Sequence, residues 1–146
     1  MTKEVYVSHP IAGREIEDVR ELAHTVARRL DDIGLGAALP LDVEPWPHDG
    51  PCPRSYSGDE KHTAACYLRA DLAVLLTCDL AVLLTCDALL AMPGWPESVG
   101  CREEVRVAHV VGIPVYFLGA DWTVWGSGQT LTWASFGLAV VRGGAP

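Results

Sequence analysis

The sequence is poor in positive charge. Its 146 residues include 11 lysines and arginines against 19 aspartates and glutamates, so the formal net charge is −8. Proteins that bind nucleic-acid polymers need a basic surface to neutralise phosphates, and this composition argues against such a partner. A mononucleotide needs only a local anion site, so a small phosphorylated ligand stays compatible with the charge.

The sequence also lacks a hydrophobic run long enough to cross a membrane. Its most apolar segment, residues 71–86, is interrupted by Asp79 and is shorter than the roughly 20 residues of a spanning helix. No signal peptide is expected, because Met1-Thr-Lys-Glu is followed by only a short apolar run. We therefore expect a cytoplasmic protein without membrane contact.

Cysteines with metal-site spacing are absent as well. The five cysteines stand at positions 52, 66, 78, 86 and 101, and their separations match no zinc motif. Reduced core thiols are the simplest interpretation for a cytoplasmic protein, with disulfides as the alternative. We expect neither a metal nor any other cofactor.

The most informative stretch of the sequence is a strand, a loop, a helix and a second strand in succession. Residues 87–92 are an apolar run, and residues 93–96 break it with proline and glycine. Ser98 is a good N-cap, Gly112 ends the helix, and residues 115–118 form the next apolar run. The apolar helical face is expected to consist of Val105, Val107, Ala108, Val110 and Val111. This order predicts a βαβ unit of a parallel sheet.

Similar elements precede this unit. Residues 4–9 alternate as a strand, residues 14–33 carry apolar side chains at helical spacing, residues 35–39 form a short strand, and residues 61–86 form a helix. The prediction is an α/β fold, a single-domain Rossmann-like (flavodoxin-like) parallel sheet flanked by helices. It spans residues 1–146, with the core in 4–118 and a Trp-rich C-terminal segment in 119–146.

Polar residues gather where ligands bind in such sheets, outside the carboxyl ends of the strands and near helix N-termini. Glu103 and Glu104 are expected in the first helical turn, where carboxylates simply complement the helix dipole. Glu104, however, follows Gly100 by four residues and so lies on the same face one turn later. A ligand on the amides at the helix start would then be within reach of the Glu104 carboxylate. Both interpretations stay open.

At these residues the sequence resembles the nucleoside 2-deoxyribosyltransferase superfamily. The resemblance rests on Ser98-x-Gly100-x-x-x-Glu104, which follows an Asp-led strand ending in Pro93-Gly94-Trp95. Near the N-terminus it rests on Tyr6-x-Ser8-His9-Pro10-Ile11. It covers residues 4–118, is specific in the middle and is loose in residues 40–65. The pattern is most similar to a small uncharacterised branch near the nucleoside 5′-monophosphate N-glycosidases.

The resemblance implies roles for individual residues. Glu104 matches the nucleophile that attacks the anomeric carbon, and Tyr6 matches a tyrosine that lies near it. Ser98 stands where nucleoside transferases usually carry an acidic residue on the sugar 5′-hydroxyl and where the monophosphate hydrolases carry a phosphate-binding serine. Because serine donates to a phosphate that aspartate would repel, Ser98 favours a nucleotide substrate. The substrate-binding residues are expected to be Ser8, His9, Pro10, Ile11, Gly94, Trp95, Ser98 and Gly100.

His9 departs from the family pattern, which has glycine at this position. Glycine lets the backbone approach a ligand closely, and a histidine puts that approach in doubt. His9 would instead add a cation or a donor near a phosphate, or be an ordinary surface histidine at a strand end. The sequence does not decide between these alternatives.

An octapeptide that is repeated unchanged complicates the remaining catalytic position. Residues 71–78 recur as residues 79–86, which indicates a recent duplication, since two short copies cannot build a solenoid. The resemblance implies a helix aspartate eight residues before the aspartate that begins the next strand. Asp79 has that spacing to Asp87, so we assign Asp79 to leaving-group protonation. The alternative, with Asp71 in the site, would force an apolar octapeptide out of the core.

The resemblance thus implies hydrolysis of the base–sugar bond of a (deoxy)ribonucleoside 5′-monophosphate, with Glu104, Asp79 and Tyr6 as catalytic residues. The alternatives are 2′-deoxyribosyl transfer between bases, a nucleotide-binding sensor without activity, and an interaction domain that uses the Trp-rich segment. A cytokinin-activating-type phosphoribohydrolase fits Pro93-Gly94-Trp95 poorly. Related enzymes complete each site from a neighbouring subunit, so a homodimer or larger homo-oligomer is expected.

Residues 40–60 are rich in proline, glycine and aspartate and have no periodicity. Trp46 and His48 in this loop would contact a base, because an aromatic face stacks on any base. The alternative is a variable surface insert.

Overall fold

The computed structural model describes residues 2–10, 14–39 and 79–143 of the chain. Its elements are β1 (Glu4–Ser8), α1 (Ile16–Asp32), β2 (Gly36–Ala38), α3 (Asp79–Thr85), β3 (Ala88–Ala91), the 3-10 turn η2 (Trp95–Glu97), α4 (Val99–Val111), β4 (Val115–Leu118), β5 (Val124–Gly126), β6 (Gln129–Leu131) and α5 (Trp133–Arg142). The expectations for Ile11, for the loop at 40–60 and for Asp71 lie outside the described residues.

One six-stranded sheet runs through the described part of the chain, in the order β2-β1-β3-β4-β5-β6. The first four strands are parallel, with Val5 paired to Ala88 and Leu89 to Val115. This order of parallel strands is that of flavodoxin-like sheets and confirms the expected α/β class. The sheet is mixed, because β5 and β6 add an antiparallel edge.

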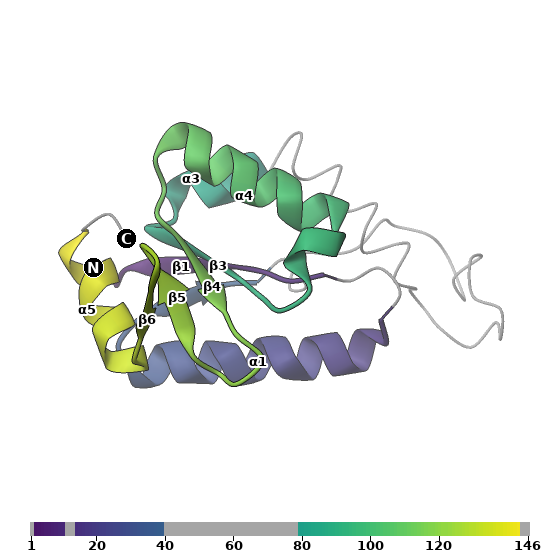
Figure 1. The fold of residues 1–146 in the computed structure, drawn as a ribbon, viewed down its shortest axis with the longest axis horizontal. Helices are drawn as coiled ribbons and strands as arrows, with labels where there is room; N and C mark the ends of the chain where they lie inside the picture. The colour runs from purple at the N-terminus through teal and green to yellow at the C-terminus, as the bar shows by residue number, and fades with distance from the viewer. Residues whose placement is uncertain (1, 11–13, 40–78, 144–146) are drawn as a thin grey trace, which may run out of the picture.

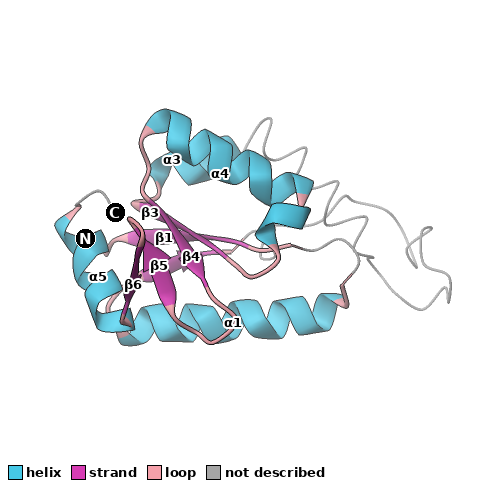
Figure 2. Cartoon of the chain, in the orientation of Figure 1, coloured by secondary structure: helices cyan, strands magenta, loops and turns pink. Residues whose placement is uncertain are grey.

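Helices cover both faces of the sheet (Figure 1), with α1 and α5 on one side and α3 and α4 on the other (Figure 2). Side chains that alternate along each strand build two apolar layers. In β1, Val5 and Val7 join the layer of α1 and α5, whereas Tyr6 joins the layer of α3 and α4. The sheet is therefore buried from both sides, as parallel strands require.

Helix α1 forms where helical periodicity predicted it. Its buried side chains recur at helical spacing: Val19, Ala23, Val26 and Leu30. Acidic residues occupy its first turn and Arg29 its last, which suits the helix dipole. The chain then turns through Gly34, at φ +81°, into β2.

Helix α4 confirms the predicted ends and part of the predicted face. Ser98 is its N-cap, with its Oγ accepting a hydrogen bond from the Cys101 N–H at 3.3 Å, and Gly112 ends it at φ +83°. Val105 and Ala108 are buried as expected, whereas Val110 and Val111 are 73% and 45% exposed. The other buried residues of the helix are Gly100, Cys101 and Glu104. The buried face therefore includes a glutamate, which a prediction from apolar residues alone leaves out.

The Trp-rich segment extends the sheet instead of lying apart from it. Trp122, at φ +65°, makes the turn after β4, and Trp133 donates its indole N–H to the Trp122 carbonyl at 2.9 Å. Arg29 of α1 lies over both rings, at 5.4 and 5.7 Å from their centroids. These contacts fasten the C-terminal hairpin and α5 to the end of α1.

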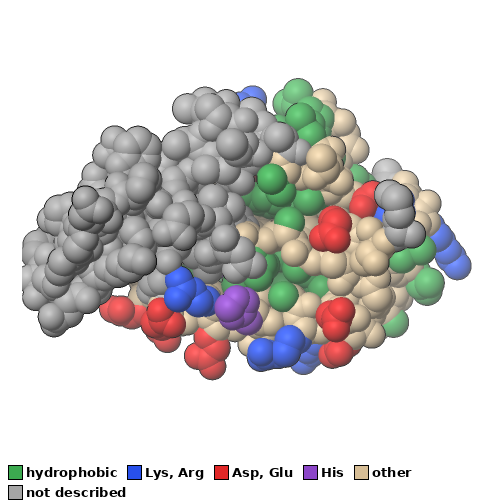
Figure 3. Space-filling model, turned by 180° about the vertical axis from the view of Figure 1, so that it is seen from behind, with side chains coloured by type: hydrophobic (Ala, Val, Ile, Leu, Met, Phe, Trp, Pro, Cys, Tyr) green, Lys and Arg blue, Asp and Glu red, His purple; other side chains and the backbone are tan. Residues whose placement is uncertain are grey.

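The surface seen from behind carries acidic and basic side chains mixed along its lower edge, over α1 (Figure 3). Charges of both signs are interspersed there, so this face shows no concentrated basic patch among the described residues. None of the helices described here combines the length and the apolarity that crossing a bilayer requires.

Candidate active site

The candidate site lies at the carboxyl ends of the parallel strands. β1 ends at Ser8 and β3 at Ala91, and these two residues are paired in register. The chain leaves β3 through Pro93 and Gly94 and enters α4 at the same edge of the sheet (Figure 1). The order β2-β1-β3 places the point where the chain connections reverse between β1 and β3, which is where ligands bind in open α/β sheets.

The start of α4 presents backbone amides around the buried Gly100. Ser98 uses its hydroxyl oxygen to accept from Cys101, so its own hydroxyl hydrogen stays available for donation. A Cβ added at Gly100 would meet, as its nearest described atom, only Ser98 Oγ at 4.0 Å. This end of α4 can therefore receive a polar group of a ligand.

Glu103 and Glu104 are neighbours in sequence with opposite surroundings. Both lie in the second turn of α4, because the helix begins at Val99, so the expectation of first-turn glutamates was wrong. Glu103 is exposed and pairs with Arg106 at 2.8 Å, and that hydrogen bond lowers the pKa of the Glu103 carboxyl. Glu104 is only 4% exposed. Since ionised carboxylates are rarely buried without a purpose, Glu104 is the candidate for chemistry.

Tyr6, Ser8 and Glu104 share the layer between the sheet and α4. Tyr6 packs with Val105, the neighbour of Glu104, in the apolar cluster of this layer. Ser8 follows Tyr6 by two residues on β1 and so faces the same side. Its Oγ is fully buried and has no hydrogen-bond partner among the described residues. A buried hydroxyl without a partner at the end of a strand marks a position for a ligand group.

His9 follows directly after β1 and is neither a surface residue nor a cation. It is 5% exposed, and neither ring nitrogen has a hydrogen-bond partner within the described ranges. Burial, with the positive charge of Arg14 and then His24 as smaller causes, lowers the pKa of His9 from 6.5 to about 4. The imidazole is therefore neutral at pH 7. Of the three alternatives that the sequence left open for this residue, the surface histidine is wrong, the lowered pKa opposes the cation, and the donor role stays a prediction.

Arg14 joins the two loops of the site, which the sequence did not reveal. Its guanidinium donates a hydrogen bond to the Pro93 carbonyl at 3.3 Å. Gly94, at φ +88°, leaves room for this side chain, and a Cβ there would collide with the guanidinium and approach Pro10 to 3.4 Å. The signal in the sequence was the glycine itself, which was expected to break the strand and to bind the substrate but not to make room for an arginine.

Trp95 closes the other end of the site. Its ring lies 5.3 Å from that of Phe117 on β4, with 34° between the ring planes. The indole is half-buried and belongs to the layer that contains Tyr6 and Val105. The expected residues thus fall into one region, with Tyr6, Ser8, Trp95, Ser98, Gly100 and Glu104 on the α4 side and His9, Pro10 and Gly94 around the strand ends.

Helix α3 corresponds to the second copy of the octapeptide. It begins at Asp79 and leads directly into β3, beside α4 (Figure 2). The chain runs through α3 toward the amino end of β3, so Asp79 stands at the end of the helix that is nearer the site. Only the backbone of Asp79 is described, and its catalytic role stays a prediction. Asp87 has a structural role, since it accepts a hydrogen bond from the Glu4 N–H at 2.9 Å.

The described residues suggest neither a metal site nor a reactive thiol. No three His, Cys, Asp or Glu side chains among them are arranged to hold a metal ion. Cys86 and Cys101 are buried and form no disulfide, and burial raises the pKa of the Cys86 thiol to about 11. Such a thiol is protonated at neutral pH and is a poor nucleophile.

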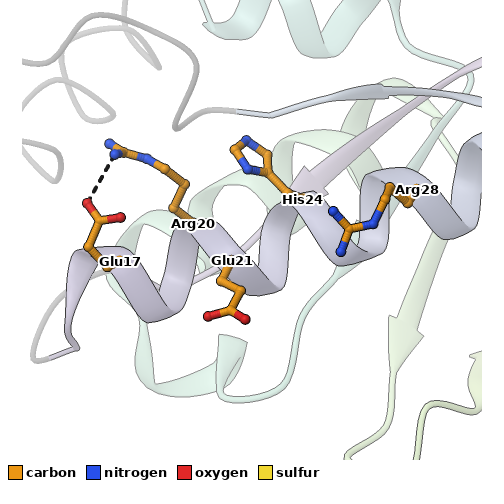
Figure 4. A pocket seen from close by; sticks show the side chains of 5 residues that line it. All are labelled: Glu17, Arg20, Glu21, His24 and Arg28. Atoms are coloured by element: carbon orange, nitrogen blue, oxygen red, sulfur yellow. Dashed lines mark hydrogen bonds and ion pairs between the residues drawn. The ribbon is translucent and has the colours of Figure 1, made fainter.

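A surface groove of about 290 Å³ lies along α1, and none of the expected substrate-binding or catalytic residues lines it (Figure 4). Its lining side chains all come from α1: Glu17, Arg20, Glu21, His24 and Arg28. Arg20 and Glu17 form an ion pair at 3.1 Å across one helical turn. Carboxylates and guanidiniums are mixed in this groove, so it does not resemble a site for one kind of charged ligand.

Comparison with known proteins supports the fold. No family model and no curated protein matches the sequence. A conserved protein from Enterococcus faecalis V583 matches in structure with a TM-score of 0.53 and 21% identity, over 83% of this chain and 70% of that one. A 2-deoxyribosyltransferase from Bacillus psychrosaccharolyticus matches with a TM-score of 0.51 and 14% identity, over 78% of this chain and 70% of that one. The described part of the chain therefore has a deoxyribosyltransferase-like α/β fold.

Proposed function

We propose that the protein cleaves the N-glycosidic bond of a nucleoside-type substrate, with Glu104 as the nucleophile. The observation that carries this proposal is the burial of Glu104 on the sheet-facing side of α4, one turn after Gly100 and at the carboxyl edge of the strands. The likeness of the fold to a 2-deoxyribosyltransferase gives the same chemistry independent support.

The reaction takes two displacements at the anomeric carbon. A Glu104 carboxylate oxygen forms a bond to C1′ while the C1′–N bond breaks, and the electron pair of that bond leaves with the base. Asp79 supplies the proton that the departing base nitrogen takes up. The product is a glycosyl ester on Glu104. A nitrogen of a second base then attacks C1′, releases the carboxylate and returns a proton to Asp79.

Transfer between bases is the version that the fold comparison favours, since the matching enzyme is a 2-deoxyribosyltransferase. Hydrolysis of a nucleoside 5′-monophosphate is the second candidate, and one residue favours it. Ser98 is uncharged where an acidic side chain would repel a phosphate, and it stands at the amide-rich start of α4. In that version water, in place of a second base, attacks the glycosyl ester.

The experiment is a base-exchange and base-release assay read by chromatography. The four common 2′-deoxynucleosides and their 5′-monophosphates are each incubated with the protein, with and without a second free base. Glu104→Gln keeps the size of the side chain and removes the nucleophile, so we expect at least a 1,000-fold lower rate, roughly the scale on which catalytic nucleophiles contribute.

Glu103→Gln is the matched control, because it makes the same change one residue away at an exposed carboxylate paired with Arg106. It should retain the wild-type rate within about threefold, as surface substitutions usually do. Equal rates for wild type and Glu104→Gln would contradict the proposal. Ligand binding without any turnover by wild type would leave the sensor interpretation in its place.

The assignment of Asp79 over Asp71 has its own test. Asp79→Asn should lower the rate most for substrates whose base leaves as a poor leaving group, because protonation matters most there. Asp71→Asn should leave the rate unchanged. The reverse result would place the first copy of the octapeptide in the catalytic register.

A homo-oligomer is also part of the proposal. Large apolar side chains are exposed on α4, β5 and α5, among them Val99 (55%), Trp125 (45%) and Leu138 (54%). Exposed apolar groups of this size suit a subunit contact. Sedimentation at the concentrations used for the assay should show a dimer or larger species, and an active monomer would refute this part.

A further inference from the structure

Two adjacent polar side chains at the end of β1 are buried without hydrogen-bond partners in the described part of the chain. Ser8 is 0% exposed and His9 is 5% exposed, and the Ser8 hydroxyl and both His9 ring nitrogens are unsatisfied there. Leaving such groups unpaired costs free energy, and native proteins rarely accept it without a reason. Three unsatisfied atoms on consecutive residues at a ligand-binding edge point to groups of a ligand.

The two side chains face opposite sides of the strand. Ser8 alternates with Tyr6 and so lies on the α4 side with Glu104. His9 alternates with Val7, which belongs to the layer of α1, and one of its electrostatic neighbours, His24, lies on α1. A ligand that satisfies both residues therefore reaches around the end of β1, with its reacting part near Ser8 and a remote part at His9.

The chemistry of a neutral imidazole restricts what that remote part is. In either tautomer one ring nitrogen donates and the other accepts. A group that is both acceptor and donor, such as a hydroxyl or the amide edge of a base, satisfies both nitrogens. A phosphate offers acceptors only and would face one nitrogen lone pair with negative charge unless His9 took up a proton. Burial and the nearby Arg14 oppose that proton.

We propose that His9 is a specificity-determining residue, which binds an uncharged donor–acceptor group of the substrate at the end of β1 and thereby selects nucleosides over nucleoside 5′-monophosphates. This inference rests on the proposed function and decides between its two versions, in favour of the nucleoside. Arg14 acts electrostatically on His9 and would attract a phosphate, but it is exposed and already donates a hydrogen bond to the Pro93 carbonyl.

Binding measurements in the Glu104→Gln background test the inference without turnover. Isothermal titration would compare each 2′-deoxynucleoside with its 5′-monophosphate at pH 7.5 and pH 5.5. We expect the nucleoside to bind more tightly than the monophosphate, with no proton taken up. His9→Leu removes both ring nitrogens and should weaken nucleoside binding about tenfold, the usual scale of one lost buried hydrogen bond. Monophosphate binding should change less than nucleoside binding.

Two further variants distinguish a loss of binding contacts at His9 from a folding defect. His9→Gln retains a donor and an acceptor and should restore most of the selectivity that His9→Leu loses. His109→Gln changes an exposed histidine near the end of α4 and should leave binding as in wild type. Thermal melts of all variants establish that each is folded at the assay temperature.

The two sources of the donor–acceptor group are separated by 5′-deoxy analogues and free bases. If His9 binds the 5′-hydroxyl, the 5′-deoxynucleoside binds about tenfold more weakly to wild type, and His9→Leu has no further effect on it. This result supports the inference. If His9 binds the base edge, His9→Leu weakens the free base instead, and because the nucleoside and its monophosphate share that edge, this result would overturn the selection between them.

An unchanged ratio of nucleoside to monophosphate affinity in His9→Leu would overturn the inference. So would proton uptake on monophosphate binding with an affinity that rises toward pH 5.5. Base exchange that depends on Glu104 while His9 has no effect on selectivity would refute this inference alone. Absence of both binding and exchange would refute the proposed function and this inference together.

Discussion

Acid should destabilise the protein through the side chain of His9. In the unfolded chain this histidine has a pKa near 6.5, whereas burial, Arg14 and His24 lower the pKa in the folded protein to about 4. Between these two values the unfolded state binds a proton that the folded state does not. The free energy of unfolding therefore falls as the pH falls from about 6.5 to about 4, and His9 contributes no pH dependence above that window.

The magnitude follows from the difference between the two pKa values. A shift of about 2.5 units corresponds to about 3 kcal/mol, of which about 2 kcal/mol is lost at pH 5. His9 is 5% exposed, so solvent screening does not reduce this figure much. A loss of this size is a large part of the total stability of a domain, which is about 5–15 kcal/mol.

Urea unfolding at pH 7.5, 6 and 5 measures the effect. His9→Gln cannot take up the proton, so its stability should fall by about 2 kcal/mol less than that of wild type between pH 7.5 and pH 5. Carboxylates that titrate in the same range affect both proteins equally and cancel in the difference. His109→Gln, at an exposed site, should follow wild type. Parallel curves for wild type and His9→Gln would show that His9 is not buried as a neutral side chain.

Three substitutions test the packing around the site. Gly94→Ala should destabilise the protein by about 1–3 kcal/mol, because the residue has φ +88° and its Cβ would collide with Arg14. The midpoint of urea unfolding measures this loss. An unchanged midpoint would contradict the contact between Gly94 and Arg14. Gly100→Ala should instead stabilise α4 by about 0.5–1 kcal/mol, since the nearest described atom to the new methyl group is Ser98 Oγ at 4.0 Å, while it weakens ligand binding. A titration that shows undiminished affinity would mean that the start of α4 is not part of the site. Phe136→Ala should lower the free energy of unfolding by about 3–5 kcal/mol, because the ring is fully buried and lies edge-on to the Tyr116 ring, with 4.8 Å between the ring centroids. A loss below about 1 kcal/mol in calorimetry would show that α5 is not packed on the sheet.

Local sequence signals were enough to predict the βαβ unit that carries the site. The strand at 115–118, the N-cap Ser98 and the terminating Gly112 are all found where the sequence placed them. These features depend on hydrogen bonds and backbone preferences within a few residues, so the sequence contains them directly. The four-residue spacing after Gly100 only placed Glu104 within reach of a ligand at the start of α4, and its role as a nucleophile is what the family resemblance implies.

The limits of the face that α4 buries were decided only by tertiary contacts. Periodicity correctly included Val105 and Ala108 in the buried face, but it added Val110 and Val111, which are exposed, and omitted Glu104, which is buried. The exact limits of the covered face depend on where the distant strands β1, β3 and β4 lie. The antiparallel edge of β5 and β6 was missed for a similar reason, because three-residue strands carry almost no periodic signal.

His9 and Arg14 show most clearly which properties of a residue cannot be predicted from the sequence. The sequence offered a cation, a hydrogen-bond donor or a surface residue for His9, and its neighbours in the chain did not decide between them. The tertiary structure buries the imidazole near Arg14 and His24 and so removes its charge. Desolvation and pairing depend on groups far apart in sequence, such as Arg14 at the Pro93 carbonyl. The sequence by itself determined which elements form and which carboxylate to examine, and only the fold decided the charge and the contacts of the residues around that carboxylate.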